Sequence, residues 1–272
     1  MIQERRWSGT SRHIYSHWPA YLLAYSAIIL SLLVIGLSIE RGWWAFVDYA
    51  AVLLVVVIYF LLASLWSAHE LYDREGLRPH HRLFDLGQIQ DTDVFVCIDL
   101  GLRWRAISLG RRLTTGHVSV IDVYHPQLTP GRALVRGRTR QPAPPDDPRF
   151  SWLSGSVELL PLPDNSVTAV VLCQVLSEFW QEGDRLSLLR EAHRILVPNG
   201  RLLLAEPVRS QINWLVRGTT AWPLKPAARW RELLDEAGFD VSKEQSLLGL
   251  IHCFCAHKQP PAQARPLPLE LP

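Results

Sequence analysis

The sequence predicts an α/β domain with a mostly parallel sheet, placed behind an N-terminal pair of apolar helices. Two observations carry this prediction. Two long runs without charged residues precede residue 70, and short apolar runs alternate with segments of helical spacing after about residue 90. Strands that alternate with helices imply a parallel sheet covered on both faces. Such a sheet binds its ligand at the carboxyl ends of its strands.

Composition limits the function classes. The chain has 272 residues, enough for one catalytic domain and a smaller part, and 48% hydrophobic against 20% charged residues exclude a wholly disordered chain. A net charge of +2 argues against a protein built to coat nucleic acid. The 4 cysteines lack the spacing of a disulfide-stapled module or a zinc site, and we expect no metal. They lie in predicted strands as small core residues: Cys97, Cys173, Cys253 and Cys255.

The two apolar runs predict a transmembrane hairpin. The first extends from Pro19 to Ile39 and the second from Tyr49 to Trp66, and tryptophans flank both. About 20 apolar residues cross a bilayer core, and aromatic residues favour its interfaces. We therefore expect spans at about 21–39 and 44–66. Buried core helices are the less favoured alternative, and a cleaved signal peptide is disfavoured because no small-residue cleavage site separates the runs.

Charge predicts the orientation of this hairpin. Arg5, Arg6 and Arg12 precede the first span, several arginines follow the second, and Arg41 alone lies in the turn. The positive-inside rule then places both termini and the following domain in the cytoplasm, in a multi-pass protein of the inner or plasma membrane. The expected parts are a cytoplasmic segment 1–18, a hairpin 19–68, a linker 69–90, a domain 91–259 and a disordered Pro-rich tail 260–272.

The predicted elements of the domain follow in order. Expected strands are Val94–Leu100, His117–His125, 149–157, Val167–Val175 and 201–208, with a last strand or strand pair at 247–257. Helical spacing covers 103–113, 178–196 and 226–238. Residues 126–148 are predicted to be a turn-rich connector. The segment 209–222 is either an interfacial element or an ordinary helix on the sheet, and periodicity does not decide.

Four motifs of this domain resemble class I S-adenosylmethionine (SAM)-dependent methyltransferases, over about residues 90–258. They are VFVCIDLG at 94–101, VIDVYHP at 120–126, SGSVELLPLPDNSVTAVVLCQVLSEF at 154–179 and LLREAHRILVPNGRLLLAEP at 188–207. The last two are similar to the branch that includes quinone and sterol methyltransferases. The resemblance implies a Rossmann-like sheet and SAM as cofactor.

The resemblance also implies a cofactor site. Asp99 and Gly101 correspond to the first turn, and Asp122 to the acid that binds the ribose hydroxyls. Ser156 and Val157 correspond to positions beside the adenine, and Gln174 to one near the methionine part. This sequence departs from the family turn D-x-G-x-G-x-G, because it has Arg103 and Arg105 where the family has glycines. Ser156 also stands where an aspartate is common. In one interpretation an arginine binds the SAM carboxylate, or the loop follows a wider path. In the other, the site is degenerate.

Two functions remain open from the sequence. The first is a membrane-anchored methyltransferase acting on a quinone, isoprenoid or lipid, since a tether beside the bilayer raises the effective concentration near such acceptors. The second is a non-catalytic membrane scaffold that binds a protein partner. His125 and Glu178 are candidate proton acceptors by location, but a solvated histidine and a helix N-terminal glutamate are the favoured interpretations. No catalytic residue is assigned, and no nucleic acid is expected as partner.

Overall fold

The computed structural model describes residues 8–259, and the predicted tail 260–272 lies outside the described residues. The N-terminal part contains α1 (Ser8–Ser16), α2 (Trp18–Glu40) and α3 (Trp44–Ala68), followed by the short turns η1 (His69–Asp73) and η2 (Glu75–Leu77) and by α4 (Pro79–Leu86). The predicted linker thus contains helical structure. Pro79 fits the first position of α4, where its missing N–H costs nothing.

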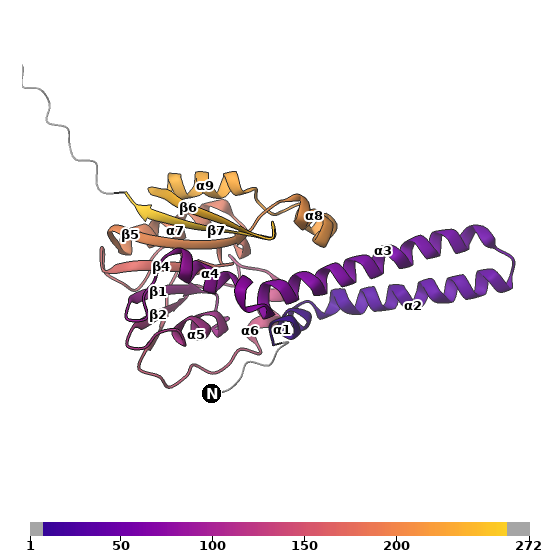
Figure 1. Cartoon of the computed structure of the whole chain (residues 1–272), viewed down its shortest axis with the longest axis horizontal. Helices are drawn as coiled ribbons and strands as arrows, with labels where there is room; N and C mark the ends of the chain where they lie inside the picture. The colour runs from indigo at the N-terminus through magenta and orange to yellow at the C-terminus, as the bar shows by residue number, and fades with distance from the viewer. Residues whose placement is uncertain (1–7, 260–272) are drawn as a thin grey trace, which may run out of the picture.

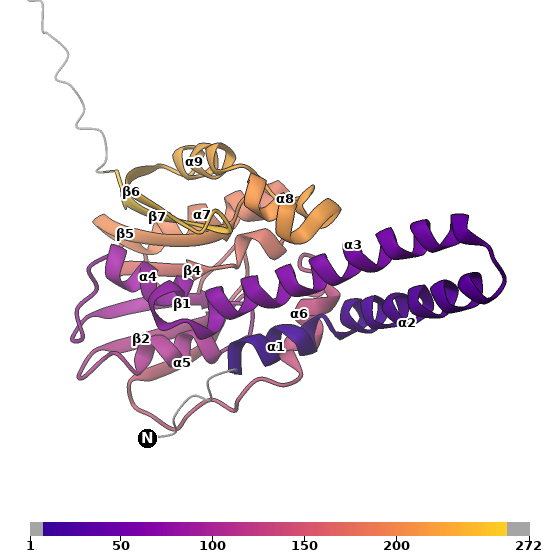
Figure 2. The ribbon, with the colours of Figure 1, turned by 45° about the vertical axis from the view of Figure 1, so that its right-hand side comes forward.

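The two apolar helices α2 and α3 form an antiparallel hairpin that extends away from the sheet (Figure 1; Figure 2). Both predicted helices are therefore confirmed as helices. They are long and apolar enough to cross a membrane, with a hydropathy of 2.5 for each. Where the hairpin meets the domain, the Tyr21 hydroxyl lies 2.9 Å from the Ser64 hydroxyl and joins the two helices. Most of their apolar side chains are exposed, as in Leu23 and Tyr49.

A seven-stranded sheet forms the domain, in the order β3-β2-β1-β4-β5-β7-β6. The strands are β1 (Val94–Asp99), β2 (His117–Asp122), β3 (Phe150–Ser154), β4 (Val167–Cys173), β5 (Leu196–Pro207), β6 (Phe239–Leu247) and β7 (Ile251–Lys258). The first five pair in parallel, while β7 is antiparallel to β5 and to β6. The predicted mostly parallel sheet is confirmed, and its strand order reverses between β1 and β4.

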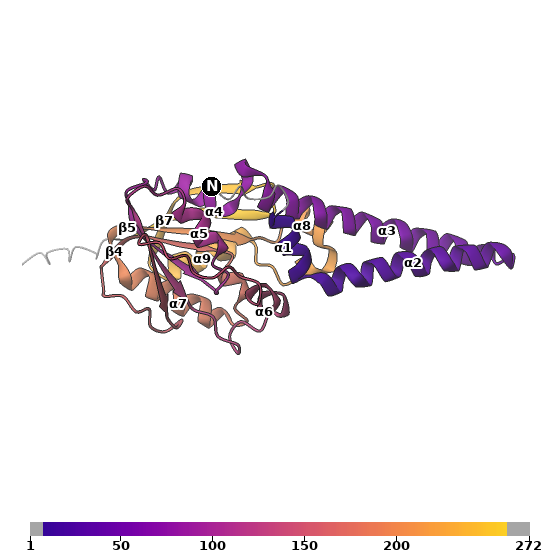
Figure 3. The same cartoon turned by 90° about the horizontal axis from the view of Figure 1, so that it is seen from below.

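Helices cover both faces of the sheet (Figure 1; Figure 3). On one face lie α4 and α5 (Trp104–Gly110), and on the other α7 (Glu182–Ile195) and α9 (Ala227–Glu236). Because successive side chains of a strand point to opposite faces, Phe95 and Cys97 of β1 join the first core, while Val96 and Ile98 join the second. The cysteines Cys97, Cys173, Cys253 and Cys255 are buried and free, as predicted.

The structure corrects two expectations. The connector 126–148 contains a helix, α6 (Arg132–Arg138), and the strand β6 was not predicted. Both have weak sequence signals, since three of the seven residues of α6 are arginines and one is a glycine, and most β6 side chains are exposed polar residues on an edge strand. The segment 209–222 forms α8 (Gln211–Arg217) and η4 (Gly218–Ala221), which pack beside α3, with the Phe60 ring close to Gly218.

Candidate functional site

Three residues of the predicted cofactor site meet where β1 and β2 end. Asp99 and Asp122 are register partners at the last positions of the two strands. Gly101 follows with a φ of +74°, a conformation that favours glycine. A Cβ added there would lie 2.7 Å from the Asp122 carboxylate and closer still to the Arg138 guanidinium. The glycine therefore provides both the turn and the room beside the acid.

The Asp99 carboxylate holds the loop that follows β1. It is buried, and it accepts the Arg103 backbone N–H at 2.6 Å. Burial raises the pKa of this carboxyl group above its usual range. Arg103 itself has a φ of +46°. The loop thus keeps a backbone conformation typical of glycine at a position where the sequence has arginine.

The Asp122 carboxylate accepts hydrogen bonds from protein donors. Its oxygens accept the Tyr124 backbone N–H at 3.0 Å and the Arg138 guanidinium at 3.1 Å. Arg138 also donates to the Leu100 carbonyl, and its guanidinium lies 3.9 Å from the centre of the Tyr124 ring. This arginine comes from α6, in the segment predicted as a connector, so sequence reasoning missed it.

At the end of β4, Gln174 is the centre of a second polar group. Its φ is +54°, and its side-chain oxygen accepts hydrogen bonds from Arg105 and, at 3.2 Å, from the Tyr72 hydroxyl. The buried Arg105 side chain also donates to the Cys173 carbonyl at 2.5 Å. Arg105 therefore occupies the position of a family glycine in sequence but points inward, toward the end of β4.

A buried carboxylate that the sequence did not single out holds the loop after β4. Both oxygens of Glu206, near the end of β5, are used: Oε1 accepts the N–H groups of Val175 and Leu176 at 2.9 and 2.8 Å, and Oε2 accepts that of Ser177 at 3.1 Å. Burial raises the pKa of Glu206 to about 7. The only sequence signal was an acid at the end of a buried strand.

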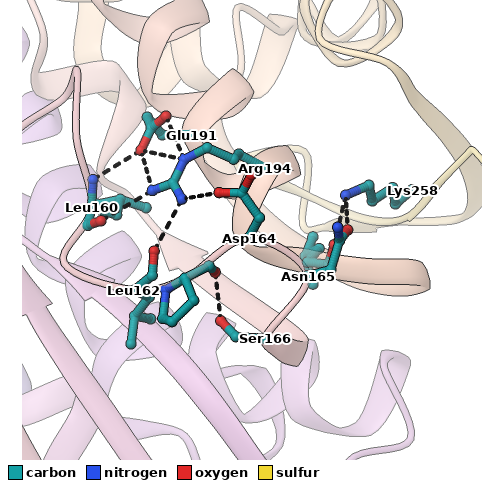
Figure 4. Close-up of polar contacts among 10 residues, drawn as sticks. Leu160, Leu162, Asp164, Asn165, Ser166, Glu191, Arg194 and Lys258 are labelled. Atoms are coloured by element: carbon teal, nitrogen blue, oxygen red, sulfur yellow. Dashed lines mark hydrogen bonds and ion pairs between the residues drawn. The ribbon is translucent and has the colours of Figure 1, made fainter.

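The two residues predicted beside the adenine lie in the loop after β3. Val157 is buried, and Ser156 is exposed and accepts the Leu159 N–H at 3.1 Å. Figure 4 shows how Arg194 of α7 holds the later part of this loop. Its guanidinium donates to the carbonyls of Leu160 and Leu162, both at 3.0 Å, as well as to the carboxylates of Asp164 and Glu191.

A cavity of about 140 Å³ lies on the β4 side of this edge. It is not lined by Asp99, Gly101 or Asp122, so the predicted site residues do not share one cleft in this conformation. Gln174 and Glu178 do line it, whereas the other candidate proton acceptor, His125, does not. The remaining wall comes from α1 and the residue after it, from Tyr72 of η1, from the loop after β1, from the start of α5 and from α6. These residues include His13, His17, Leu102, Trp104, Arg105, Ala133 and Leu134.

Comparison with known proteins identifies similarity to methyltransferases over part of the chain. Residues 105–204 match the family model described as a methyltransferase domain. A probable SAM-dependent methyltransferase of Mycolicibacterium smegmatis is 37% identical over 112 residues, which are 39% of this chain and 40% of that protein. The match thus spans about two fifths of the relative's length.

Solved structures share the fold at low identity. A SAM-dependent methyltransferase from Aquifex aeolicus aligns with a TM-score of 0.50 and 17% identity, covering 66% of this chain and 89% of that one. The [4+2]-cyclase SpnF aligns with a TM-score of 0.51 and 16% identity, covering 70% and 83%. Because a cyclase is among them, this likeness concerns the fold and not the reaction. The chain therefore carries the α/β fold of the SAM-dependent methyltransferases, with a methyltransferase domain matched over residues 105–204.

Proposed function

We propose that the chain is a membrane-anchored SAM-dependent methyltransferase that methylates a lipophilic acceptor, such as a quinone, an isoprenoid or a lipid. One observation carries the proposal. Gly101 and Asp122 adjoin at neighbouring strand ends of a methyltransferase fold, and two long apolar helices precede that fold. The proposed parts are the hairpin 19–68 and the catalytic domain 91–259, joined by the segment 69–90.

The proposed cofactor contacts use groups that suit SAM. The Asp122 carboxylate would accept the two ribose hydroxyls, because an ionised carboxylate offers several acceptor positions. Gly101 lets the backbone approach the cofactor, since it has no Cβ. Asp99 would support the same turn, Gln174 would lie near the methionine part, and Ser156 and Val157 near the adenine. When bound, SAM supplies an electrophilic methyl group on a sulfonium.

The residues present fit this cofactor once Arg138 moves. In the described conformation its guanidinium lies in the space beside Gly101 and Asp122 that a ribose would need. The side chains of Arg138 and Asp122 are 27% and 30% exposed, and a partly exposed pair of this kind contributes about 0–1 kcal/mol. The side chain is long and comes from a short helix, so a ligand can displace it without disturbing the sheet.

The exposed hairpin supports anchoring in a bilayer. Leu23 and Tyr49 are 72% and 76% exposed, and such long apolar surfaces are unfavourable in water. A helix of 23 residues is about 35 Å long, which exceeds the roughly 30 Å of a hydrocarbon core. Trp18, Trp43 and Trp44 lie near the helix ends, as interfacial residues do. We propose that both ends of the hairpin face the cytoplasm, at an inner or plasma membrane.

The segment 209–222, which contains α8 and η4, supports the same orientation. It packs beside α3, close to Phe60, and it exposes Leu215 and Trp222 at 56% and 71%. An apolar surface next to a membrane helix is suited to the interface between lipid and water. We propose that this segment rests on the bilayer and holds the carboxyl edge of the sheet near lipid-soluble acceptors.

A specific observation favours a second candidate function, a membrane scaffold that binds a protein partner. Arg103 and Arg105 replace glycines of the SAM-binding turn, and Arg138 covers the ribose-binding acid. In that case the arginines would replace the cofactor permanently. The two functions differ in one measurable property, the affinity for SAM.

Titration calorimetry of the full chain in lipid nanodiscs with SAM, and with its demethylated product, tests the proposal. We expect binding by the unmodified chain and about 30-fold weaker binding by Asp122→Ala, because hydrogen bonds to a charged group contribute about 2 kcal/mol. The exposed Asp146→Ala is the matched control and should bind normally. No heat at millimolar ligand would favour the scaffold. Release of the chain from membranes by alkaline carbonate would refute the anchor.

A further inference from the structure

The cavity near β4 has the size of one ring. Its volume of about 140 Å³ is close to the roughly 150 Å³ that holds a benzene molecule, and below the roughly 300–1,000 Å³ of pockets for larger ligands. It is therefore too small for a whole nucleoside cofactor. Apart from Gln174, it contains none of the residues proposed to hold SAM.

The helix α1 forms one wall of this cavity and is fixed at both ends. The Asp73 carboxylate accepts the backbone N–H groups of Gly9 and Thr10 at 2.7 and 3.0 Å. At the other end, Arg136 of α6 donates to the Ser16 carbonyl at 2.7 Å. The helix α1 leads directly into the hairpin of α2 and α3 (Figure 2). Because α1 lines the cavity, the cavity lies where the proposed anchor meets the catalytic domain.

Aromatic rings form much of the cavity wall. The ring of His13 stacks on that of Tyr72, with centroids 6.0 Å apart and an angle of 29°. Tyr72 meets Trp104 edge-on at 6.2 Å, and His13 stacks on His17 at 4.4 Å. Flat π-surfaces in these arrangements favour a planar aromatic ligand over a branched aliphatic one.

The polar groups of the cavity suit a hydroxyl that loses its proton. Glu178 is half-buried, and no residue within 8–259 donates a hydrogen bond to its carboxylate. Burial raises the pKa of Glu178, whereas burial lowers that of His13 to about 3. Glu178 is therefore the stronger base of the two. The buried Arg105 adds a positive charge that favours an anion over a cation.

We infer that this cavity is the acceptor site and that it takes a hydroxylated aromatic ring, with Glu178 as the group that receives the hydroxyl proton. The inference rests on the proposed function and names its acceptor class. The O–H bond breaks, the proton passes to the Glu178 carboxylate, and the electron pair stays on the ring oxygen near Arg105. Gln174 lines the cavity and is also proposed beside the methionine part of SAM, so ring and methyl donor would share this wall.

Binding of two small probes, without SAM, tests this site. The full chain in nanodiscs is titrated with 4-nitrophenol and with nitrobenzene, which lacks the hydroxyl, and empty nanodiscs are subtracted. We expect 4-nitrophenol to bind about tenfold more tightly. Ala133→Phe places a ring in the cavity and should abolish the binding of both probes. Val135→Phe, on the exposed side of the same helix, is the matched control and should leave both unchanged.

A second variant tests the role of Glu178 separately. Glu178→Leu replaces the proton acceptor with an apolar side chain of similar size, so it should weaken the binding of 4-nitrophenol about tenfold and leave that of nitrobenzene unchanged. Circular dichroism checks that each variant folds; if Ala133→Phe does not, Glu178→Leu decides alone. Equal binding of both probes, or 4-nitrophenol binding that Glu178→Leu does not weaken, overturns the inference. A chain that binds SAM but neither probe also overturns it, whereas ring binding without SAM binding overturns the proposed function instead.

Discussion

The two halves of the ligand edge of this sheet are built differently. Where β1 and β2 end, Gly101 and Asp122 adjoin at the position proposed for the ribose, and the Arg138 guanidinium fills the space between them. Where β4 ends, Gln174 and Glu178 line a cavity. The half at the ends of β1 and β2 is thus closed by a side chain, and we call it the closed half. The half at the end of β4 contains the cavity, and we call it the open half.

The difference shows that the two arginines at positions where the family turn has glycine have separate physical effects. Arg103 keeps a positive φ, so the turn retains its path. Arg105 points inward and donates to the carbonyl of Cys173 and the side chain of Gln174. The side chain that closes the ribose half comes from neither position but from Arg138 in α6. The two arginines of the motif therefore do not themselves fill the space proposed for the ribose.

The largest expected effect concerns Glu206, which holds the loop of the open half. Its pKa in the folded chain is about 7, above its ordinary value of 4.5. A raised pKa means that folding is favoured while the group is protonated, so this contribution is complete below pH 4.5 and is lost as the pH rises to about 7. The shift corresponds to about 3 kcal/mol of unfolding free energy.

Denaturant unfolding of the full chain in detergent between pH 4 and 8 measures this effect. Glu206→Gln should reduce the loss of stability between pH 4.5 and 7 by about 3 kcal/mol, because the amide does not titrate. The control is Glu182→Gln, since hydrogen bonding to Arg229 lowers the pKa of Glu182 to about 2. The contribution of Glu182 to the unfolding free energy is present above pH 4.5 and is lost only in stronger acid. Identical pH profiles for Glu206→Gln and the unmodified chain would contradict the prediction.

A smaller effect is expected from Arg194, which holds the loop beyond the closed half (Figure 4). Arg194→Leu removes its hydrogen bonds to Leu160, Leu162 and Asp164, and should cost about 2 kcal/mol of unfolding free energy. If Ser156 and Val157 contact the adenine, SAM binding should weaken as well. Arg190→Leu, an exposed position of the same helix, is the control. Loss of stability with unchanged SAM affinity would remove the loop from the site.

The sequence predicted the sheet well and the site only in part, for physical reasons. Buried strands have long apolar runs, so β1, β2 and β4 were predicted to within three residues at each end. Helix α6 has no such run, and its side chain Arg138 reaches Asp122 from 16 positions away. Glu206 likewise depends on a contact with a loop about 30 positions earlier. Contacts of this kind follow from the tertiary arrangement and leave no local pattern.

Arg138 offers a direct comparison of the closed and open halves. Arg138→Gln removes an ion pair worth roughly 1 kcal/mol, so the affinity for SAM should rise about fivefold. Binding of 4-nitrophenol in the open half should stay the same. Calorimetry of the full chain measures both, with the exposed Arg132→Gln as control. Weaker SAM binding by Arg138→Gln would mean that this arginine holds the cofactor instead of excluding it.

The smallest expected effect concerns the turn of the closed half. Arg103 has a φ of +46° and a ψ of −40°, which costs a residue with a Cβ about 1–3 kcal/mol. Glycine avoids this strain but loses up to about 1 kcal/mol through its freer unfolded chain. Glycine also loses the hydrogen bond that the Arg103 guanidinium donates to the Pro142 carbonyl, worth about 1 kcal/mol, so Arg103→Gly should raise the unfolding free energy by at most about 1 kcal/mol. Arg111→Gly, at a φ of −67°, has no strain to relieve and should lower it. Equal losses from both substitutions would show that the turn owes its path to the arginine side chain and not to a glycine-like backbone.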